Sequence, residues 1–94
     1  MIVYLSGKIS GDENYREKFN KVEEKLLDLG YTVLNPVWIK ANLSYEQYMR
    51  IDLAMLNEAD AICMLNDYFE SKGAMCELQL AETLGKYVMY ENKL

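Results

Sequence analysis

Two acidic residues lie among the apolar positions of predicted helices. Asp52 falls between Met49 and Leu56 at helical spacing, and Glu77 follows Ala74 by three residues. An ionised carboxylate that leaves water without a partner costs several kcal/mol, so an inward-facing acid needs a partner, a capping role or a task. The structural alternative is that each acid lies at the edge of its apolar stripe and reaches water or a neighbouring loop.

Two acids that face one crevice can split a glycosidic bond. One attacks or stabilises the anomeric carbon of the sugar, and the other handles the proton of the leaving group. Glu77 is the predicted nucleophile because it lies within about two turns of its helix start, where the helix dipole favours an anion. Asp52 then handles the proton. Tyr4, in the first predicted strand, can bring its hydroxyl near Glu77, although a packed strand tyrosine is the alternative.

A second chemistry-bearing segment, SGKISG, follows the first predicted strand. Glycines allow close backbone approach, hydroxyls and amides can point at an anion, and the lysine adds a full positive charge. The spacing matches neither the dinucleotide-binding nor the P-loop pattern, and a simple turn is the alternative. The candidate anion-binding residues here are Ser6, Gly7, Lys8, Ser10 and Gly11.

Ser71 and Gly73 open a later predicted helix and form a second hydroxyl-and-amide site, although Ser71 is also a natural N-cap. Aromatic residues could form a wall against a nucleobase, but at helical spacing they also fit a core or a subunit interface. These aromatic candidates are Trp38, Tyr45 and Tyr48.

Composition narrows the function classes. The chain has 94 residues with 51% hydrophobic side chains, which fits one domain over residues 1–94. A net charge of −5 argues against a sequence-independent hold on nucleic acid. Histidine is absent, which excludes Ser-His-Asp and Cys-His nucleophiles and His-ligated metal sites. The glycosidase chemistry requires no metal and no organic cofactor, and we expect neither.

Two further expectations concern the environment of the chain. Cys63 and Cys76 lie in apolar periodic segments, so we expect two buried free thiols of a reducing compartment. The sequence has no long apolar run and no leader pattern, which predicts a soluble cytoplasmic protein without a membrane partner.

Hydrophobic periodicity alternates between strand and helix patterns along the chain. It predicts strands over residues 1–5, 31–34, 61–65 and 87–90, and helices over 14–29, 44–58 and 73–84. Such alternation is typical of an α/β fold with a parallel sheet covered on both faces. We expect an open four-stranded sheet in the order 2-1-3-4, a flavodoxin- or Rossmann-like three-layer sandwich. Ligands of such folds bind beyond the carboxyl ends of the strands, at the switch point between the first and third strands.

Three motifs in this order resemble the nucleoside 2-deoxyribosyltransferase superfamily. They are YLSGKISG at residues 4–11, Asp52 followed by LxxADA at 56–61, and SxGxxxExxxA at 71–81. Among characterised branches the chain is most similar to the 2′-deoxynucleoside 5′-monophosphate N-glycosidases. The segment YMRIDLAML at 48–56 is typical of short phage-type and bacterial members of unknown function.

The resemblance implies roles for individual residues. Glu77 corresponds to the nucleophile, Asp52 to an acid on the sugar or proton path, and Tyr4 to a tyrosine that orients the nucleophile. The loop with Gly7, Lys8 and Ser10 corresponds to the one that holds a 5′-phosphate or 5′-hydroxyl. Ser71 corresponds to a serine that can reach a neighbouring subunit's phosphate, because members are homodimers or larger.

Two departures from the family pattern matter. Lys8 and Ser10 replace the serine and arginine of the monophosphate glycosidases, so phosphate recognition is rearranged. The chain also lacks most of the C-terminal extension of the transferases, which weighs against base exchange.

Three functions remain open from the sequence. The first is an N-glycosidase, hydrolase or transferase, that acts on a (deoxy)nucleoside or its 5′-monophosphate. The second is a non-catalytic protein that binds a nucleotide or a nucleotide-derived signal on the same fold. The third is an interaction protein in which the acids are incidental, because one α/β scaffold hosts many unrelated sites.

Overall fold

The structure, a computed structural model, describes residues 1–94, and its elements follow the predicted order. The strands are β1 (Ile2–Ser6), β2 (Thr32–Leu34), β3 (Ala61–Met64) and β4 (Tyr87–Tyr90), and the helices are α1 (Tyr15–Asp28), α2 (Tyr45–Glu58) and α3 (Lys72–Thr83). Short 3₁₀ turns are η1 (Pro36–Trp38), η2 (Tyr68–Glu70) and η3 (Glu91–Lys93). No helix is long and apolar enough to cross a membrane.

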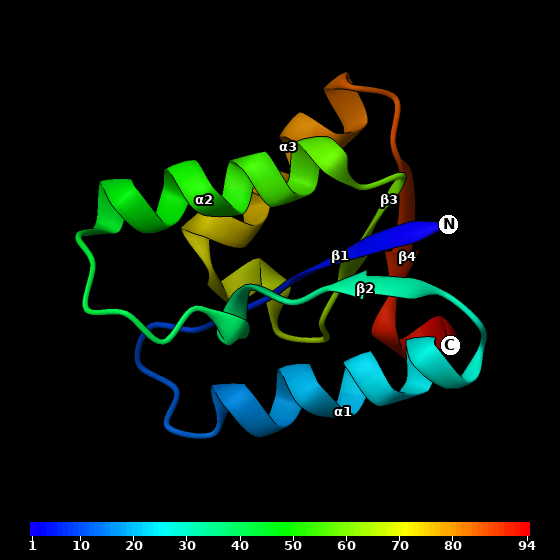
Figure 1. The fold of residues 1–94 in the computed structure, drawn as a ribbon, viewed down its shortest axis with the longest axis horizontal. Coiled ribbons are helices and arrows are strands. Elements are labelled where there is room, and N and C mark those ends of the chain that lie inside the picture. The colour runs from blue at the N-terminus through cyan, green and yellow to red at the C-terminus, as the bar shows by residue number, and fades with distance from the viewer.

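The four strands form one parallel sheet in the order β2-β1-β3-β4, as predicted. Helix α1 covers one face, and α2 and α3 cover the other, which gives the expected three-layer α/β fold (Figure 1). The loops that follow β1 and η1 lie together at the carboxyl edge of the sheet, at the left of Figure 1.

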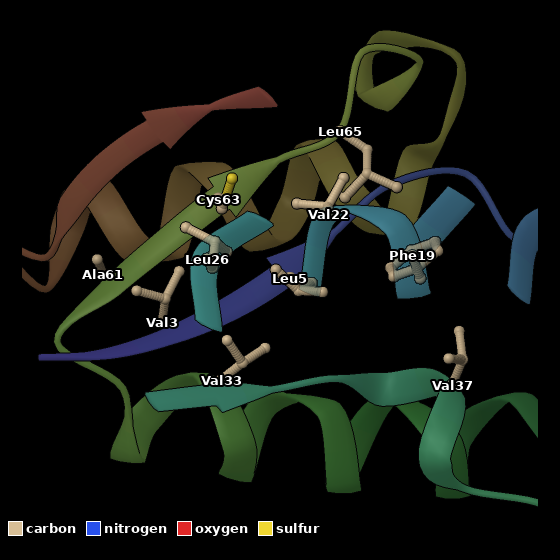
Figure 2. Packing of buried hydrophobic residues seen from close by; sticks show 10 residues of the cluster. All are labelled: Val3, Leu5, Phe19, Val22, Leu26, Val33, Val37, Ala61, Cys63 and Leu65. Carbon is tan, nitrogen blue, oxygen red and sulfur yellow. The ribbon is translucent and has the colours of Figure 1, made fainter. Parts of the chain in front are cut away.

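Strand alternation divides the core between the two faces. On the α1 face, side chains from three strands pack with α1 into one buried apolar cluster, as Figure 2 shows. The members of this cluster are Val3, Leu5, Phe19, Val22, Leu26, Val33, Val37, Ala61, Cys63 and Leu65. The other face has a smaller cluster, Tyr4, Leu56, Ala59, Ile62, Met64, Ala74 and Ala81. Full burial of one large apolar side chain contributes about 1.5–3 kcal/mol, so the α1 face holds more of the apolar stabilisation.

Local signals in the sequence set the helix ends. Ser44 caps α2 in a complete capping box: its side chain accepts the Gln47 amide, and the Gln47 side chain accepts the Ser44 amide. Helix α1 stops before Gly30, whose φ of 92° is a conformation that other residues rarely adopt. The predicted boundaries are confirmed to within one or two residues.

The apolar stripes of α2 and α3 are covered less completely than the spacing predicts. Tyr45 is 66% exposed and Leu84 is also exposed, whereas Leu56 is the only buried residue of α2. The prediction of two buried thiols is half wrong: Cys63 is buried, but Cys76 is exposed because it precedes the inward-facing Glu77 by one helical position. The predicted homo-oligomer would cover such apolar surface, and it stays a prediction.

Candidate functional site

Glu77 is the most constrained polar side chain of the molecule. It lies in the second turn of α3, is only 5% exposed, and contacts β1. Its Oε2 accepts a hydrogen bond from the Tyr4 hydroxyl at 2.7 Å, and its Oε1 accepts one from the Ser6 hydroxyl at 2.6 Å. Tyr4 and Ser6 are two positions apart on one strand, so both hydroxyls point to the same face of the sheet. The carboxylate is therefore held in one orientation by two donors.

The environment of Glu77 acts on its charge in two opposing ways. Burial raises the pKa of Glu77, while the hydrogen bonds from Ser6 and Tyr4 favour the ionised form. Burial, followed by the charges of Glu77 and Asp52, raises the pKa of Tyr4 well above its usual value. Tyr4 consequently remains a hydrogen-bond donor at any physiological pH.

Asp52 lies on α2 and faces the same space. Its Oδ1 is buried and has no hydrogen-bond partner in the protein. Burial, with a further contribution from the charge of Glu77, raises the pKa of Asp52 to about 7. Near neutral pH this side chain exists in both protonation states, so it can donate or accept a proton. No group of three or more His, Cys, Asp or Glu side chains is arranged to hold a metal ion.

Both acids line a cavity of about 820 Å³ beyond the carboxyl end of β1, and its wall includes residues from the segments that follow β1, β2 and β3. This volume lies within the range of about 300–1,000 Å³ that is typical of small-ligand sites. Most residues predicted for the site lie on its wall: Tyr4, Ser6, Gly7, Lys8, Ser10, Tyr45, Tyr48, Asp52, Ser71, Gly73 and Glu77. The cavity also forms at the predicted switch point of the strand order.

Two predicted site residues do not reach the cavity. Gly11 lies outside its lining and has a φ of 78°, so it serves the turn that leads to α1. Trp38 is also outside the lining, and its indole Nε1–H donates to Glu23 at 2.9 Å. Ser71 lines the cavity and also caps α3, because its hydroxyl accepts the Ala74 amide at 3.1 Å.

The loop after β1 is fixed to the segment after β3, and this changes its expected role. The backbone N–H of Lys8 donates to Asp67 Oδ1 at 3.1 Å, so that amide is not free for an anion. Lys18 bridges Asp67 and Asp12, which ties the start of α1 to the same point. A side chain at Gly7 would bring its Cβ to 2.8 Å from the Leu65 Cβ, so only glycine fits this close approach. The loop is therefore fixed at the edge of the cavity, and one of its backbone amides is already paired.

One part of the cavity wall, residues 36–42, was not predicted from the sequence. Residues 36–42 have no periodicity, yet five residues of this segment besides Val37 line the cavity: Pro36, Ile39, Lys40, Ala41 and Asn42. Hydrogen bonds hold the segment in place, since Arg16 Nη1 donates to the Val37 carbonyl at 2.7 Å and the Tyr48 hydroxyl donates to the Ala41 carbonyl. These contacts link the segment to α1 and to α2.

The fold is similar to those of two solved deoxyribosyltransferases. A 2-deoxyribosyltransferase from Bacillus psychrosaccharolyticus superposes with a TM-score of 0.76 at 27% identity, over 96% of this chain and 71% of that protein. A 2-deoxyribosyltransferase from Leishmania mexicana superposes with a TM-score of 0.75 at 19% identity, over 95% of this chain and 62% of that protein. The predicted nucleoside 2-deoxyribosyltransferase-like fold is confirmed.

The sequence comparisons define the family. No curated protein matches the chain at a significant level. Residues 1–90 match the family model described as a domain of unknown function, DUF4406. This match extends over nearly the whole length, so the chain belongs to the DUF4406 family, with the fold of the nucleoside 2-deoxyribosyltransferases.

Proposed function

We propose that the protein cleaves the N-glycosidic bond of a nucleoside or its 5′-monophosphate, with Glu77 as the nucleophile. The observation that carries this proposal is the buried Glu77 carboxylate, oriented by the Tyr4 and Ser6 hydroxyls beside an unpartnered Asp52. Structural neighbours described as 2-deoxyribosyltransferases support the same class of chemistry, glycosyl transfer from a nucleoside.

The first step forms a glycosyl ester. A Glu77 oxygen attacks C1′ of the sugar, and the bond between C1′ and the base nitrogen breaks with its electron pair on the base. Each Glu77 oxygen accepts only one hydrogen bond from the protein, so each keeps a lone pair for attack. Protonated Asp52 gives its proton to the leaving base, which suits a carboxyl with a pKa of about 7.

The second step restores the enzyme. Asp52 is now a carboxylate and accepts a proton from a water molecule as that water attacks C1′. The ester bond to Glu77 breaks, and its electron pair returns to the Glu77 carboxylate. A second base in place of water would give transfer rather than hydrolysis by the same sequence of steps.

Release of free base from a panel of nucleosides and 5′-monophosphates, measured by chromatography, tests this proposal. Glu77→Gln should lower the rate by at least about 10³-fold, because loss of a nucleophile removes the covalent route. Glu82→Gln is the matched control, since Glu82 is an exposed acid on the same helix, and it should keep the parent rate. Circular dichroism checks that both variants fold.

Two results would count against the proposal. Equal turnover by Glu77→Gln and the parent would remove Glu77 from the mechanism. Tight binding of a nucleotide to the parent, without any release of base over hours, would instead favour a non-catalytic nucleotide-binding protein.

A further inference from the structure

The charges around the cavity are unusual for this acidic chain. Its wall includes the basic residues Lys8, Arg16, Lys40 and Lys72, although the protein has a net charge of −5. The acidic wall residues are Asp52, Glu70 and Glu77, of which Asp52 and Glu77 form the proposed reaction centre. Outside that centre, the cavity wall therefore has one acidic residue, Glu70, and four basic ones.

The four cations come from four separate segments that surround the cavity. Lys8 Nζ lies 3.5 Å from Glu70 Oε1, which brings the loop after β1 next to η2 and the start of α3, where Lys72 lies. Arg16 donates to the Val37 carbonyl, which brings it next to the segment that carries Lys40. Neither Lys40 nor Lys72 forms an ion pair within 4.0 Å, so both are available to a ligand.

We propose that the site prefers nucleotides with a chain of 5′-phosphates, a nucleoside 5′-diphosphate or triphosphate, over the monophosphate. This inference rests on the proposed function, because it assumes that C1′ lies at Glu77. Ser6, which contacts Glu77, leads directly into Gly7 and Lys8, so a sugar bound at Glu77 would lie close to the first of these four cations.

Charge and size both favour the longer phosphate chain. A single phosphate carries about −1.5 to −2 charges at neutral pH, which Lys8 and one neighbouring cation can balance. Each further phosphate adds negative charge for the remaining cations. The volume of about 820 Å³ also lies towards the upper end of the range for small-ligand sites.

Glu70 has a specific part in this preference. Its carboxylate forms an ion pair with Lys8 in the free protein, and this negative charge would repel a phosphate bound to Lys8. An incoming phosphate group must therefore replace the Glu70 carboxylate on Lys8. Removal of this charge should strengthen the binding of phosphorylated ligands and leave neutral nucleosides unaffected.

Calorimetry and thermal shift with a graded ligand series test the inference. The probes are 2′-deoxyadenosine, its 5′-monophosphate, diphosphate and triphosphate, and the corresponding guanine, cytosine and thymine series, all in the presence of a metal chelator. We expect the triphosphate of at least one base to bind about tenfold or more tightly than its monophosphate, with a steep loss at high salt.

Charge variants give opposite expected shifts. Lys40→Met and Lys72→Met should each weaken triphosphate binding several-fold, and Glu70→Gln should strengthen it several-fold. Lys25→Met and Glu82→Gln are the matched controls, because both residues are exposed and lie outside the cavity wall, and they should change nothing. Arg16 is left intact because it also holds the Val37 carbonyl.

Binding and base release are measured separately, so the two proposals can fail separately. A monophosphate that binds as tightly as the triphosphate, or a series in which no member binds, overturns the inference. The same is true if Glu70→Gln fails to strengthen triphosphate binding. If the expected order of affinities holds but no base is released, the ligand preference stands and the glycosidase proposal is lost.

Discussion

The two faces of the sheet differ in what they bury. The α1 face buries a cluster of aliphatic and aromatic side chains, and the Cys63 thiol is the only ionisable group among its ten buried members. The α2 and α3 face buries the Glu77 carboxylate with Tyr4, and three of the seven members of its apolar cluster are alanines. The α1 face therefore contributes more of the apolar stabilisation, while the α2 and α3 face carries the two acids and the cavity.

The same strand serves both faces. In β1, Val3 and Leu5 enter the apolar cluster of the α1 face, while Tyr4 and Ser6 bond to Glu77 on the opposite face. A rigid core on one side thus fixes the positions of the donors on the other. This arrangement predicts that stability and activity respond to different substitutions.

The largest expected effect on stability comes from the α1 face. Leu26→Ala should lower the free energy of unfolding by about 2–5 kcal/mol, because Leu26 is fully buried and leaves a cavity. Urea titration measures this change. The control Leu27→Ala concerns a neighbour that is 51% exposed, and it should cost about 0.5 kcal/mol or less. Loss of base release in Leu26→Ala under conditions where it is folded would contradict the division between the faces.

A smaller effect on the free energy of unfolding, of opposite sign, is expected at Asp52 on the α2 and α3 face. In the unfolded chain Asp52 ionises near its usual 3.8, but in the folded protein its pKa is about 7. The fold is therefore destabilised progressively as the pH rises from about 4 to 7, and the cost stays constant above that range. The ceiling of this cost is about 4 kcal/mol, at about 1.36 kcal/mol per pH unit.

Asp52→Asn should recover part of that cost. We expect a gain in unfolding free energy on the order of 2 kcal/mol at pH 8 and almost none at pH 4. Base release should fall by roughly 10²-fold or more, because the proton donor is lost. Parallel urea titrations at the two pH values measure the difference, with Asp28→Asn on α1 as an exposed control. A gain that is the same at both pH values would rule out the ionisation of Asp52 as its cause.

The smallest expected effect is a difference in reactivity between the two cysteine thiols, which leaves the fold unchanged. An aromatic disulfide reagent should modify Cys76 rapidly in the native protein, because this thiol is exposed, and should leave Cys63 unmodified. Burial, with a contribution from the charge of Glu91, raises the pKa of Cys63 to about 12, which removes its thiolate form at neutral pH. Mass spectrometry before and after addition of urea counts the thiols. Rapid native labelling of Cys63 would show that the α1 face opens more readily than its packing implies.

Periodicity made most of the fold predictable. Each helix carries an apolar stripe at helical spacing, and each strand is a short apolar run bounded by turn residues. Asp52 and Glu77 interrupt the helical stripes, and this interruption marked the site. The side-chain role of Ser6 was missed, although its spacing of two from Tyr4 on a strand was the available signal. Ser6 was assigned to an anion-binding loop because a serine before a glycine also fits a turn.

The rest of the site depended on tertiary contacts that leave no local pattern. The wall at residues 36–42 is held by hydrogen bonds from Arg16 and Tyr48. Neither donor belongs to a sequence pattern that includes the residue it binds. The capture of the Lys8 amide by Asp67 joins residues that are 59 positions apart. Gly11 and Trp38 were expected at the site because their types suited it, but turn geometry and a bond to Glu23 direct them elsewhere.

The alternation of Tyr4 and Ser6 with Val3 and Leu5 has a consequence for errors in folding. A slip of β1 by one residue against β3 would send both hydroxyls into the apolar layer and strip Glu77 of its donors at once. A mispaired chain could then neither settle into a stable form nor retain its carboxylate geometry. Faulty molecules should consequently be lost through aggregation or proteolysis instead of persisting as intact, inactive protein.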